Sequence, residues 1–346
     1  MILKDLSLYF LILLFITYGQ FYHQYKFSDP NLGNNDYFNY KEMIINPLNI
    51  DATGSPFVYR QFTTVISKVI YDLGIFYDSK IVFTSNNDEQ RIYFSILLSN
   101  FIGIFLCLFS LIFFLTKYYH LKSVEIIFFP ILLITSSFGY IFSGISVLTE
   151  GWTYFFNLLI FLFFIRNRYL PFLIISIISI LNKEISVIYI TMFIFFIIIH
   201  DLFFDKKINI SRVKYISTSL FLFLLYSFMR KKILPTPGYE GHLEPKSWIE
   251  NLSNISLNFS FLFQGIFSVG VFGILIVLLI YSKRIRDFYN NKYLFGITLT
   301  IFSLYILGLM TGIGNNIGRI LSSITPIISF LIIIKLVLKN EKTLLD

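Results

Sequence analysis

The sequence predicts an all-α polytopic membrane protein with about ten transmembrane helices and a long first outer loop that contains amphipathic interfacial helices. The chain of 346 residues is 56% hydrophobic and only 14% charged, whereas a soluble domain carries about 25% charged residues. Long apolar runs recur along the whole chain, without the alternation of a membrane β-barrel. Since no repeat or soluble segment interrupts them, we expect residues 1–346 to form a single integral membrane domain.

Ten apolar segments of about 17–25 residues, flanks included, are the predicted spans. They centre on residues 6–22, 92–115, 126–142, 152–165, 170–181, 185–199, 215–229, 259–281, 293–310 and 320–338. Lys4 precedes the first segment and no small-residue cleavage site follows it. This pattern predicts an uncleaved signal anchor.

The number of crossings in residues 170–199 decides the topology. This stretch is either one long helix or two short crossings broken at Asn182-Lys183-Glu184. With two crossings, the later cytosolic stretches hold eleven Lys and Arg residues and the outer stretches five, whereas one crossing inverts that ratio. Cytosolic loops of membrane proteins are rich in Lys and Arg, so two crossings are favoured, with both termini in the cytosol.

This orientation gathers five polar features on the outer face. They are the first extracytoplasmic loop (23–91), Thr149-Glu150-Gly151, Asn182-Lys183-Glu184, the second extracytoplasmic loop (230–258) and the turn 311–319. Three cations, Arg230-Lys231-Lys232, break the positive-inside rule in the second loop. Either they attract a lipid phosphate of the outer leaflet, or the predicted topology is wrong there.

The first outer loop contains an amphipathic helix, predicted from Pro56 to Phe76. Its apolar residues at 58, 62, 65, 66, 69, 70 and 73 share one helical face, and polar residues including Arg60 occupy the other. The segment is too polar to span a bilayer. It either lies along the outer membrane surface, with its apolar face in the lipid boundary or against other helices, or belongs to a small extracytoplasmic domain.

Asp36 follows the first span and is the candidate catalytic residue. A carboxylate just above the membrane could take a proton from a hydroxyl acceptor. It could also hold a divalent cation with a second carboxylate. The third interpretation is a solvated loop aspartate, because the first outer loop holds eight of the twenty carboxylates of the chain.

Charged residues at the ends of the spans are candidate substrate-binding residues. Ionisable groups at membrane depth are costly, so Glu150, Lys183 and Glu184 are expected to pair or to line a polar cavity. For Lys183 and Glu184 the alternative is a snorkelling cap role. Arg319 follows a glycine-rich turn that could cradle an anion, or it is an interfacial arginine beside an ordinary turn.

Several functional classes are excluded by composition and motifs. The formal charge of +8 comes from Lys and Arg scattered between spans, so we expect no nucleic-acid partner. A single cysteine, Cys107, allows no disulfide framework or cysteine metal site within one chain. The sequence contains no Walker loop, dinucleotide fingerprint or HExxH motif. No metal ligand set is predicted.

Three short motifs resemble those of the GT-C glycosyltransferases of the bacterial type, which use polyprenyl-phosphate-linked sugars. They are Asn35-Asp36-Tyr37-Phe38-Asn39-Tyr40, Pro56-Phe57-Val58-Tyr59-Arg60 and Asn182-Lys183-Glu184. The resemblance implies hexosyl or pentosyl transfer in cell-envelope polysaccharide biosynthesis, at the outer face of the inner membrane. Its acceptor would be a lipid-linked glycan, a polysaccharide or a protein.

The same resemblance implies roles for individual residues. Asp36 would be the base. Arg60, Lys183 and Arg319 would neutralise the donor phosphate, with Tyr59, Glu150 and Glu184 as further substrate-binding residues. Tyr37 follows Asp36 where the family commonly has Asp-Glu or Asp-x-Asp, so no cofactor is certain and a divalent cation stays open.

Two alternatives accompany this hypothesis. The first is a polysaccharide polymerase of the O-antigen type, expected to depend on outer-loop arginines rather than on a first-loop aspartate. The second is a transporter or flippase for lipid-linked saccharides, which would more often show pseudo-repeated halves and polar residues in mid-span.

Overall fold

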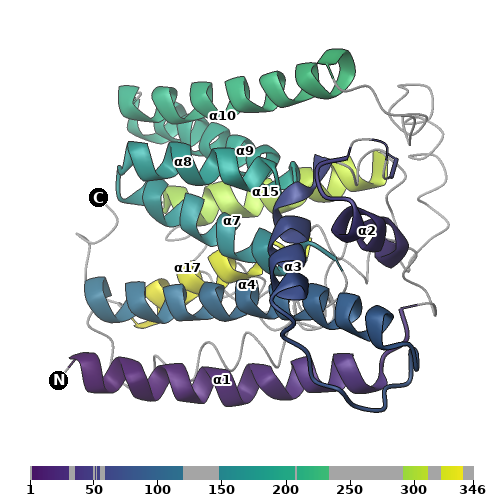
Figure 1. Ribbon diagram of the computed structural model, residues 1–346. Helices are drawn as coiled ribbons and strands as arrows, with labels where there is room; N and C mark the ends of the chain where they lie inside the picture. The colour runs from purple at the N-terminus through teal and green to yellow at the C-terminus, as the bar shows by residue number, and fades with distance from the viewer. Residues whose placement is uncertain are drawn as a thin grey trace, which may run out of the picture.

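The computed structural model is all-helical, as predicted (Figure 1). It describes residues 2–30, 36–49, 51, 53–54, 59–119, 148–206, 209–233, 291–310 and 321–337, and no strand occurs within these ranges. The longer helices lie side by side with their axes roughly aligned, some parallel and some antiparallel (Figure 1). They are α1 (Ile2–Phe27), α4 (Asn87–Tyr119), α7 (Glu150–Ile165), α8 (Tyr169–Ile180), α9 (Ile185–His200), α10 (Ile210–Phe228), α15 (Lys292–Met310) and α17 (Thr325–Val337).

Eight of the ten predicted spans coincide with these helices, and the other two, 126–142 and 259–281, lie outside the described residues. Among the described helices, Asn87–Tyr118 and Ile185–Asp205 are long and apolar enough to cross a membrane. The second of these joins α9 to the π-helical segment η2 (Asp201–Asp205). Ten crossings therefore stay a prediction.

The predicted break in residues 170–199 is confirmed as a break between two helices. Helix α8 ends at Ile180 and α9 begins at Ile185. The amides of Asn182 and Lys183 both turn back to the carbonyl oxygen of Ser179, at 3.0 and 2.8 Å. This tight turn lets α8 pack on α7 while α9 packs on α10 and α15.

Helices α4 and α7 approach each other closely because glycines occupy the contact. A Cβ atom added to Gly151 would lie 2.3 Å from the backbone oxygen of Asn100, and one added to Gly103 would lie 2.6 Å from the carbonyl carbon of Gly151. The Asn100 side chain joins the two helices: Nδ2 donates to the Leu148 oxygen (2.5 Å), and Oδ1 accepts from the Gly151 amide (3.1 Å).

Two short helices lie at one end of the helix array. Helix α2 spans Asp36–Ile45, and α3 spans Gln61–Asp72 and runs across the direction of the long helices (Figure 1). The start of α1 and the end of α17 lie at the opposite end (Figure 1). The two ends of the array therefore differ in structure.

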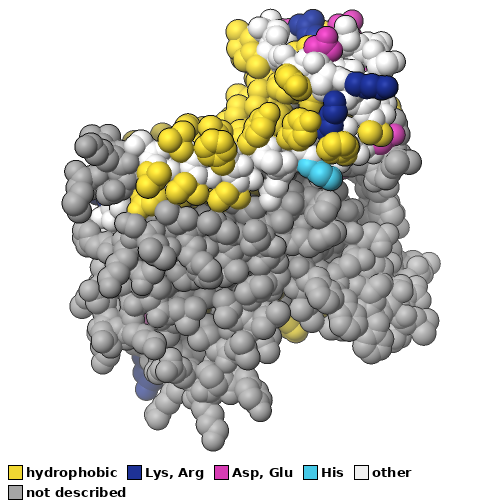
Figure 2. Space-filling view, turned by 90° about the horizontal axis from the view of Figure 1, so that it is seen from below, with side chains coloured by type: hydrophobic (Ala, Val, Ile, Leu, Met, Phe, Trp, Pro, Cys, Tyr) yellow, Lys and Arg dark blue, Asp and Glu magenta, His cyan; other side chains and the backbone are white. Residues whose placement is uncertain are grey.

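Apolar side chains are exposed along the outer helices at helical spacing. On α8 and at its C-terminal cap these are Leu170, Ile174, Ile177 and Leu181, and on α10 they are Leu220, Phe221, Leu224, Leu225 and Phe228. On α1 they are Leu8, Leu11, Phe15, Tyr18 and Tyr22. Figure 2 shows an apolar band across the described part of the face on which α1 lies, with charged side chains gathered mainly beyond one end of it. Such continuous apolar faces require a covering partner or lipid.

The glycine contact between α4 and α7 predicts a large cost for Gly151→Ala. Alanine is favoured over glycine in a helix by about 1 kcal/mol, but the clash with the Asn100 backbone is expected to outweigh this and to destabilise by about 1–3 kcal/mol. Thermal unfolding of the purified full-length protein in detergent measures the effect. Gly19→Ala on α1 is the matched control, because nothing lies within 4 Å of its added Cβ. Equal stability of the two variants would contradict the close contact.

Candidate functional site

The end of the array that carries α2 and α3 brings together residues from four separate stretches of the chain. The Phe62 amide donates to the Leu181 oxygen (3.0 Å), and the Thr63 hydroxyl donates to Asn182 Oδ1 (2.5 Å). The Tyr59 hydroxyl lies 3.3 Å from the backbone oxygen of Arg230, beyond the end of α10. Residues 59–63 of the segment 23–91 therefore dock on the turn between α8 and α9 and on the end of α10.

Helix α3 is shorter than predicted and packs against the protein through its small polar residues. It begins at Gln61, not Pro56, and ends at Asp72; residues 55–58 lie outside the described residues. Its buried residues are Thr63, Thr64, Ser67 and Ile70, whereas Val65, Val69 and Leu73 are exposed. Of the two predicted orientations, apolar face toward a lipid boundary or against other helices, the exposed Val65, Val69 and Leu73 favour the first.

The hydroxyls of α3 can be buried because they bond within their own helix. Thr64 donates to the Gln61 oxygen and Ser67 to the Thr63 oxygen, both at 2.8 Å. Small side chains satisfied in this way let α3 approach α4 closely, at little desolvation cost. The exposed valine and leucine side chains then form the outward face, which suits a lipid boundary.

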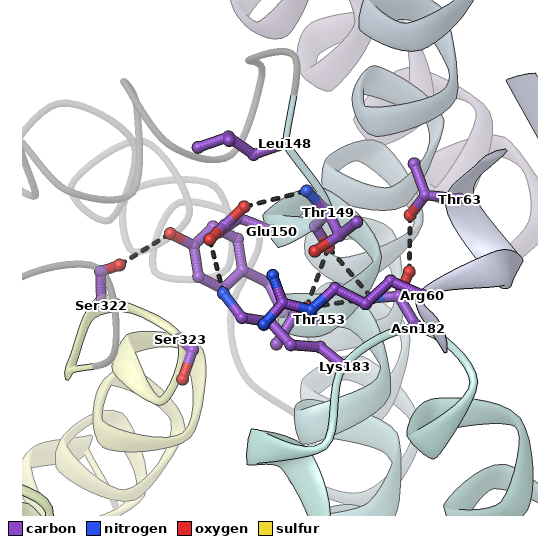
Figure 3. Close-up of polar contacts among 12 residues, drawn as sticks. Arg60, Thr63, Leu148, Thr149, Glu150, Thr153, Asn182, Lys183, Ser322 and Ser323 are labelled. Atoms are coloured by element: carbon purple, nitrogen blue, oxygen red, sulfur yellow. Dashed lines mark hydrogen bonds and ion pairs between the residues drawn. The ribbon is translucent and has the colours of Figure 1, made fainter. Parts of the chain in front are cut away.

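A buried ion pair joins the start of α7 to the α8–α9 turn. Lys183 Nζ lies 2.6 Å from Glu150 Oε1, and the side chain of Glu150 is 0% exposed. The other oxygen, Oε2, accepts from the backbone amide of Thr149 at 2.9 Å. The carboxylate therefore sits at the positive end of the α7 dipole, which stabilises its charge. Figure 3 shows this contact beside Thr149 and Asn182.

A second ion pair joins the first outer loop to the same turn. Arg60 Nη2 lies 3.3 Å from Glu184 Oε1, with side-chain exposures of 11% and 21%. Arg60 Nη1 also donates to the Tyr40 hydroxyl of α2 at 3.4 Å. The neighbours Lys183 and Glu184 thus have different partners on different segments, and neither is a cap residue extended into solvent.

We call Asp36, Tyr40, Arg60, Glu150, Lys183 and Glu184 the polar cluster. Burial by itself raises the pKa of Glu184, but the charge of Arg60, a backbone hydrogen bond and Lys183 more than offset it, so the pKa lies below its ordinary value. Burial also raises the pKa of Tyr40; Arg60 opposes this, while the Glu150 and Asp36 carboxylates add to it. Tyr40 is thus neutral at physiological pH and lies within electrostatic reach of Asp36.

Six of the seven predicted site residues lie at this end of the protein: Asp36, Tyr59, Arg60, Glu150, Lys183 and Glu184. Arg319 lies outside the described residues.

Sequence reasoning missed the roles of Tyr40 and Asn182. Tyr40 stands one helical turn after Asp36, a spacing that could have marked it. Asn182 Nδ2 donates to the Thr149 oxygen and to Thr153 Oγ1, both at 3.0 Å, so it connects α3, α7 and the turn.

The described residues bring together a different set of potential metal ligands. The ligating atoms of His200, Asp201 and Asp205 lie within 4.8 Å of one another, at the opposite end of α9. Asp201 there is paired with Arg212. Among the described residues, no group of three such side chains includes Asp36.

Comparisons with protein-family models, curated proteins and solved structures found no match to this chain.

The lowered pKa of Glu184 predicts an acid-dependent loss of stability. Because the folded pKa lies below the unfolded value of about 4.3, the ionised carboxylate stabilises the fold above that pH, and this stabilisation disappears as pH falls through the folded pKa. Glu184→Gln should therefore unfold at a lower temperature than wild type at neutral pH, and the difference should close in acid. Glu42→Gln, at an exposed glutamate of α2, is the matched control. A difference that persists unchanged in acid would contradict the ion pair with Arg60.

Proposed function

We propose that this protein is a membrane glycosyltransferase that moves a hexose or pentose from a polyprenyl-phosphate-linked donor to a lipid-linked glycan, polysaccharide or protein acceptor. The observation that carries the proposal is the polar cluster. At one end of an array of apolar helices, Arg60 contacts Tyr40 and Glu184, and Lys183, the neighbour of Glu184, pairs with Glu150. Asp36 begins α2, one helical turn before Tyr40. A site at such a boundary suits a substrate with a polar head and a long apolar chain.

The proposal places the array in a bacterial inner membrane, with ten spans and both termini in the cytosol. Two helices have the length and composition to cross a bilayer. The exposed apolar faces of α1, α8 and α10 support burial in lipid on several sides. The start of α1 and the end of α17 lie at the end of the array opposite to the polar cluster (Figure 1). With both of these ends on the cytosolic side, as proposed, the polar cluster would be extracytoplasmic.

The geometry favours Arg60 over Lys183 as the cation that meets the donor phosphate. The Lys183–Glu150 pair is short and buried, at 2.6 Å with 0% exposure of the carboxylate. The Arg60–Glu184 pair is longer, at 3.3 Å, and its carboxylate is 21% exposed. A phosphate can replace Glu184 on Arg60 at lower cost, and a guanidinium can bind it through two parallel hydrogen bonds. Arg319 remains part of the proposal from sequence alone.

In the proposed reaction, Asp36 accepts the proton of the acceptor hydroxyl as that oxygen bonds to the anomeric carbon of the donor. The bond from this carbon to the phosphate oxygen breaks, and the lipid phosphate leaves with the electron pair. Arg60 stabilises the charge that develops on this oxygen. Glu184 Oε2, which has no hydrogen-bond partner among the described residues, is placed to accept from a sugar hydroxyl.

Asp36→Asn tests this proposal. Loss of the base should lower sugar transfer by about 10²–10⁴-fold, measured with purified full-length protein and a radiolabelled polyprenyl-phosphate sugar, with expression and thermal unfolding unchanged. Asp72→Asn, at a carboxylate 56% exposed on α3, is the matched control and should keep full transfer. An active Asp36→Asn enzyme would remove Asp36 from the site.

The second candidate function is an O-antigen-type polymerase, which is expected to depend on outer-loop arginines. The contacts of Arg60 with both Glu184 and Tyr40 favour this candidate. Arg60→Lys keeps the charge but loses the planar guanidinium, so a site that depends on paired hydrogen bonds to phosphate should lose activity. The transferase mechanism expects both Asp36→Asn and Arg60→Lys to be impaired. An inactive Arg60→Lys with a fully active Asp36→Asn would identify the polymerase instead.

A further inference from the structure

The opposite end of the array contains a cavity with a different chemistry. It has a volume of about 140 Å³ and lies where the α7–α8 turn meets the starts of α10 and α15. Its lining residues are Phe164, Ile165, Asn167, Asn209, Arg212, Lys292 and Tyr293. The lining contains two cations and two carboxamides but no carboxylate, which favours an anionic occupant.

Two helix starts add positive potential to this cavity. Asn209 caps α10 by accepting from the Ser211 amide at 3.0 Å. Asn291 in the same way accepts from the amides of Tyr293 and Leu294, at 3.1 Å each, at the start of α15. Both helices have nineteen residues, so each presents the positive end of a developed dipole beside the cavity.

Arg212 is oriented by a buried carboxylate that does not line the cavity. It is 8% exposed and forms an ion pair with Asp201, which is itself 3% exposed. Within the described residues, Asp201 is the hydrogen-bond partner of the Arg212 side chain, and it engages Nη1 alone. The guanidinium is therefore oriented by a buried carboxylate while other N–H groups stay available to a ligand. Lys292 is the second cation of the lining, whereas the Asp201 and Asp205 carboxylates, which lie within 4.8 Å of each other, do not line the cavity.

We propose that this cavity binds a phosphate group, either the headgroup phosphate of a phospholipid or free inorganic phosphate. Arg212, Lys292, the two carboxamides and the two helix starts supply donors and positive potential on several sides of the cavity. In the membrane orientation proposed above, this end faces the cytosol, where headgroups of the inner leaflet lie. The site lies at the far end of α7 and α10 from the polar cluster, so its binding is measured separately from sugar transfer.

Two variants and one control test the site. Lys292→Gln removes a cation, and Asn209→Asp adds a negative charge while aspartate still caps α10. Each should weaken binding by about tenfold or more, as expected for one charge-assisted hydrogen bond. Lys214→Gln is the matched control: it removes the same charge from α10, at an exposed residue that does not line the cavity.

Two measurements on purified full-length protein distinguish the sources of the phosphate. In detergent, sodium phosphate should raise the unfolding temperature in a saturable way relative to sodium chloride at equal ionic strength, and both variants should lose this effect. From nanodiscs containing phosphatidylglycerol, native mass spectrometry should show one retained phospholipid in wild type and in Lys214→Gln, but not in Asn209→Asp.

Either result supports the site: retained lipid identifies a headgroup, and a saturable phosphate effect without retained lipid identifies the free anion. The proposal is overturned if neither effect is seen, or if Lys214→Gln weakens binding as much as Lys292→Gln.

Discussion

The close contact between α4 and α7 is the constraint on which the candidate site depends. Gly103 and Gly151 leave no room for a side chain there, so the start of α7 is held against the backbone of Asn100. Asn100 then satisfies the Leu148 carbonyl and the Gly151 amide with one carboxamide. Since Glu150 lies between these two residues, its buried carboxylate can occupy only a narrow range of positions.

Hydrogen bonds of a second carboxamide, that of Asn182, connect the start of α7 to helix α3. Asn182 takes up the carbonyl of Thr149, next to Glu150, and its oxygen accepts from Thr63 on α3. Each such bond contributes only about 0.5–1.5 kcal/mol net, but leaving one of its groups buried and unpaired costs about 1–3 kcal/mol. Loss of either asparagine would therefore loosen several elements at once, because α4, α7, the α8–α9 turn and α3 share the same contacts.

The two ends of the array bring together different sets of charged groups. One end holds the polar cluster, in which carboxylates outnumber cations, and the other holds a cavity with two cations and no carboxylate in its lining. Helix α7 alone separates them by about 24 Å, at 1.5 Å per residue for its sixteen residues. Buried ion pairs contribute little net stability, because desolvation offsets their attraction. A buried pair also lies at the other end, between Arg212 and Asp201. The proposed reaction is placed at the polar cluster because that end combines two ion pairs with Tyr40 and Asp36.

The sequence by itself determined the helical class, the positions of eight described helices, the break before α9 and the gathering of outer-loop residues at one end. These follow from local hydrophobicity and from charge distribution, which act along the chain. It did not determine which cation meets which carboxylate. Lys183 and Glu184 are neighbours in a turn, so their side chains diverge. Only the packing of α7 and of the segment before α3 on that turn gave Lys183 the partner Glu150 and Glu184 the partner Arg60. Amphipathicity did not decide the orientation of α3 either, because the pattern separates two faces without saying which one packs on the protein. The hydroxyl-bearing face could turn inward because hydrogen bonds within the helix satisfy the Thr64 and Ser67 hydroxyls, and α3 packs on α4.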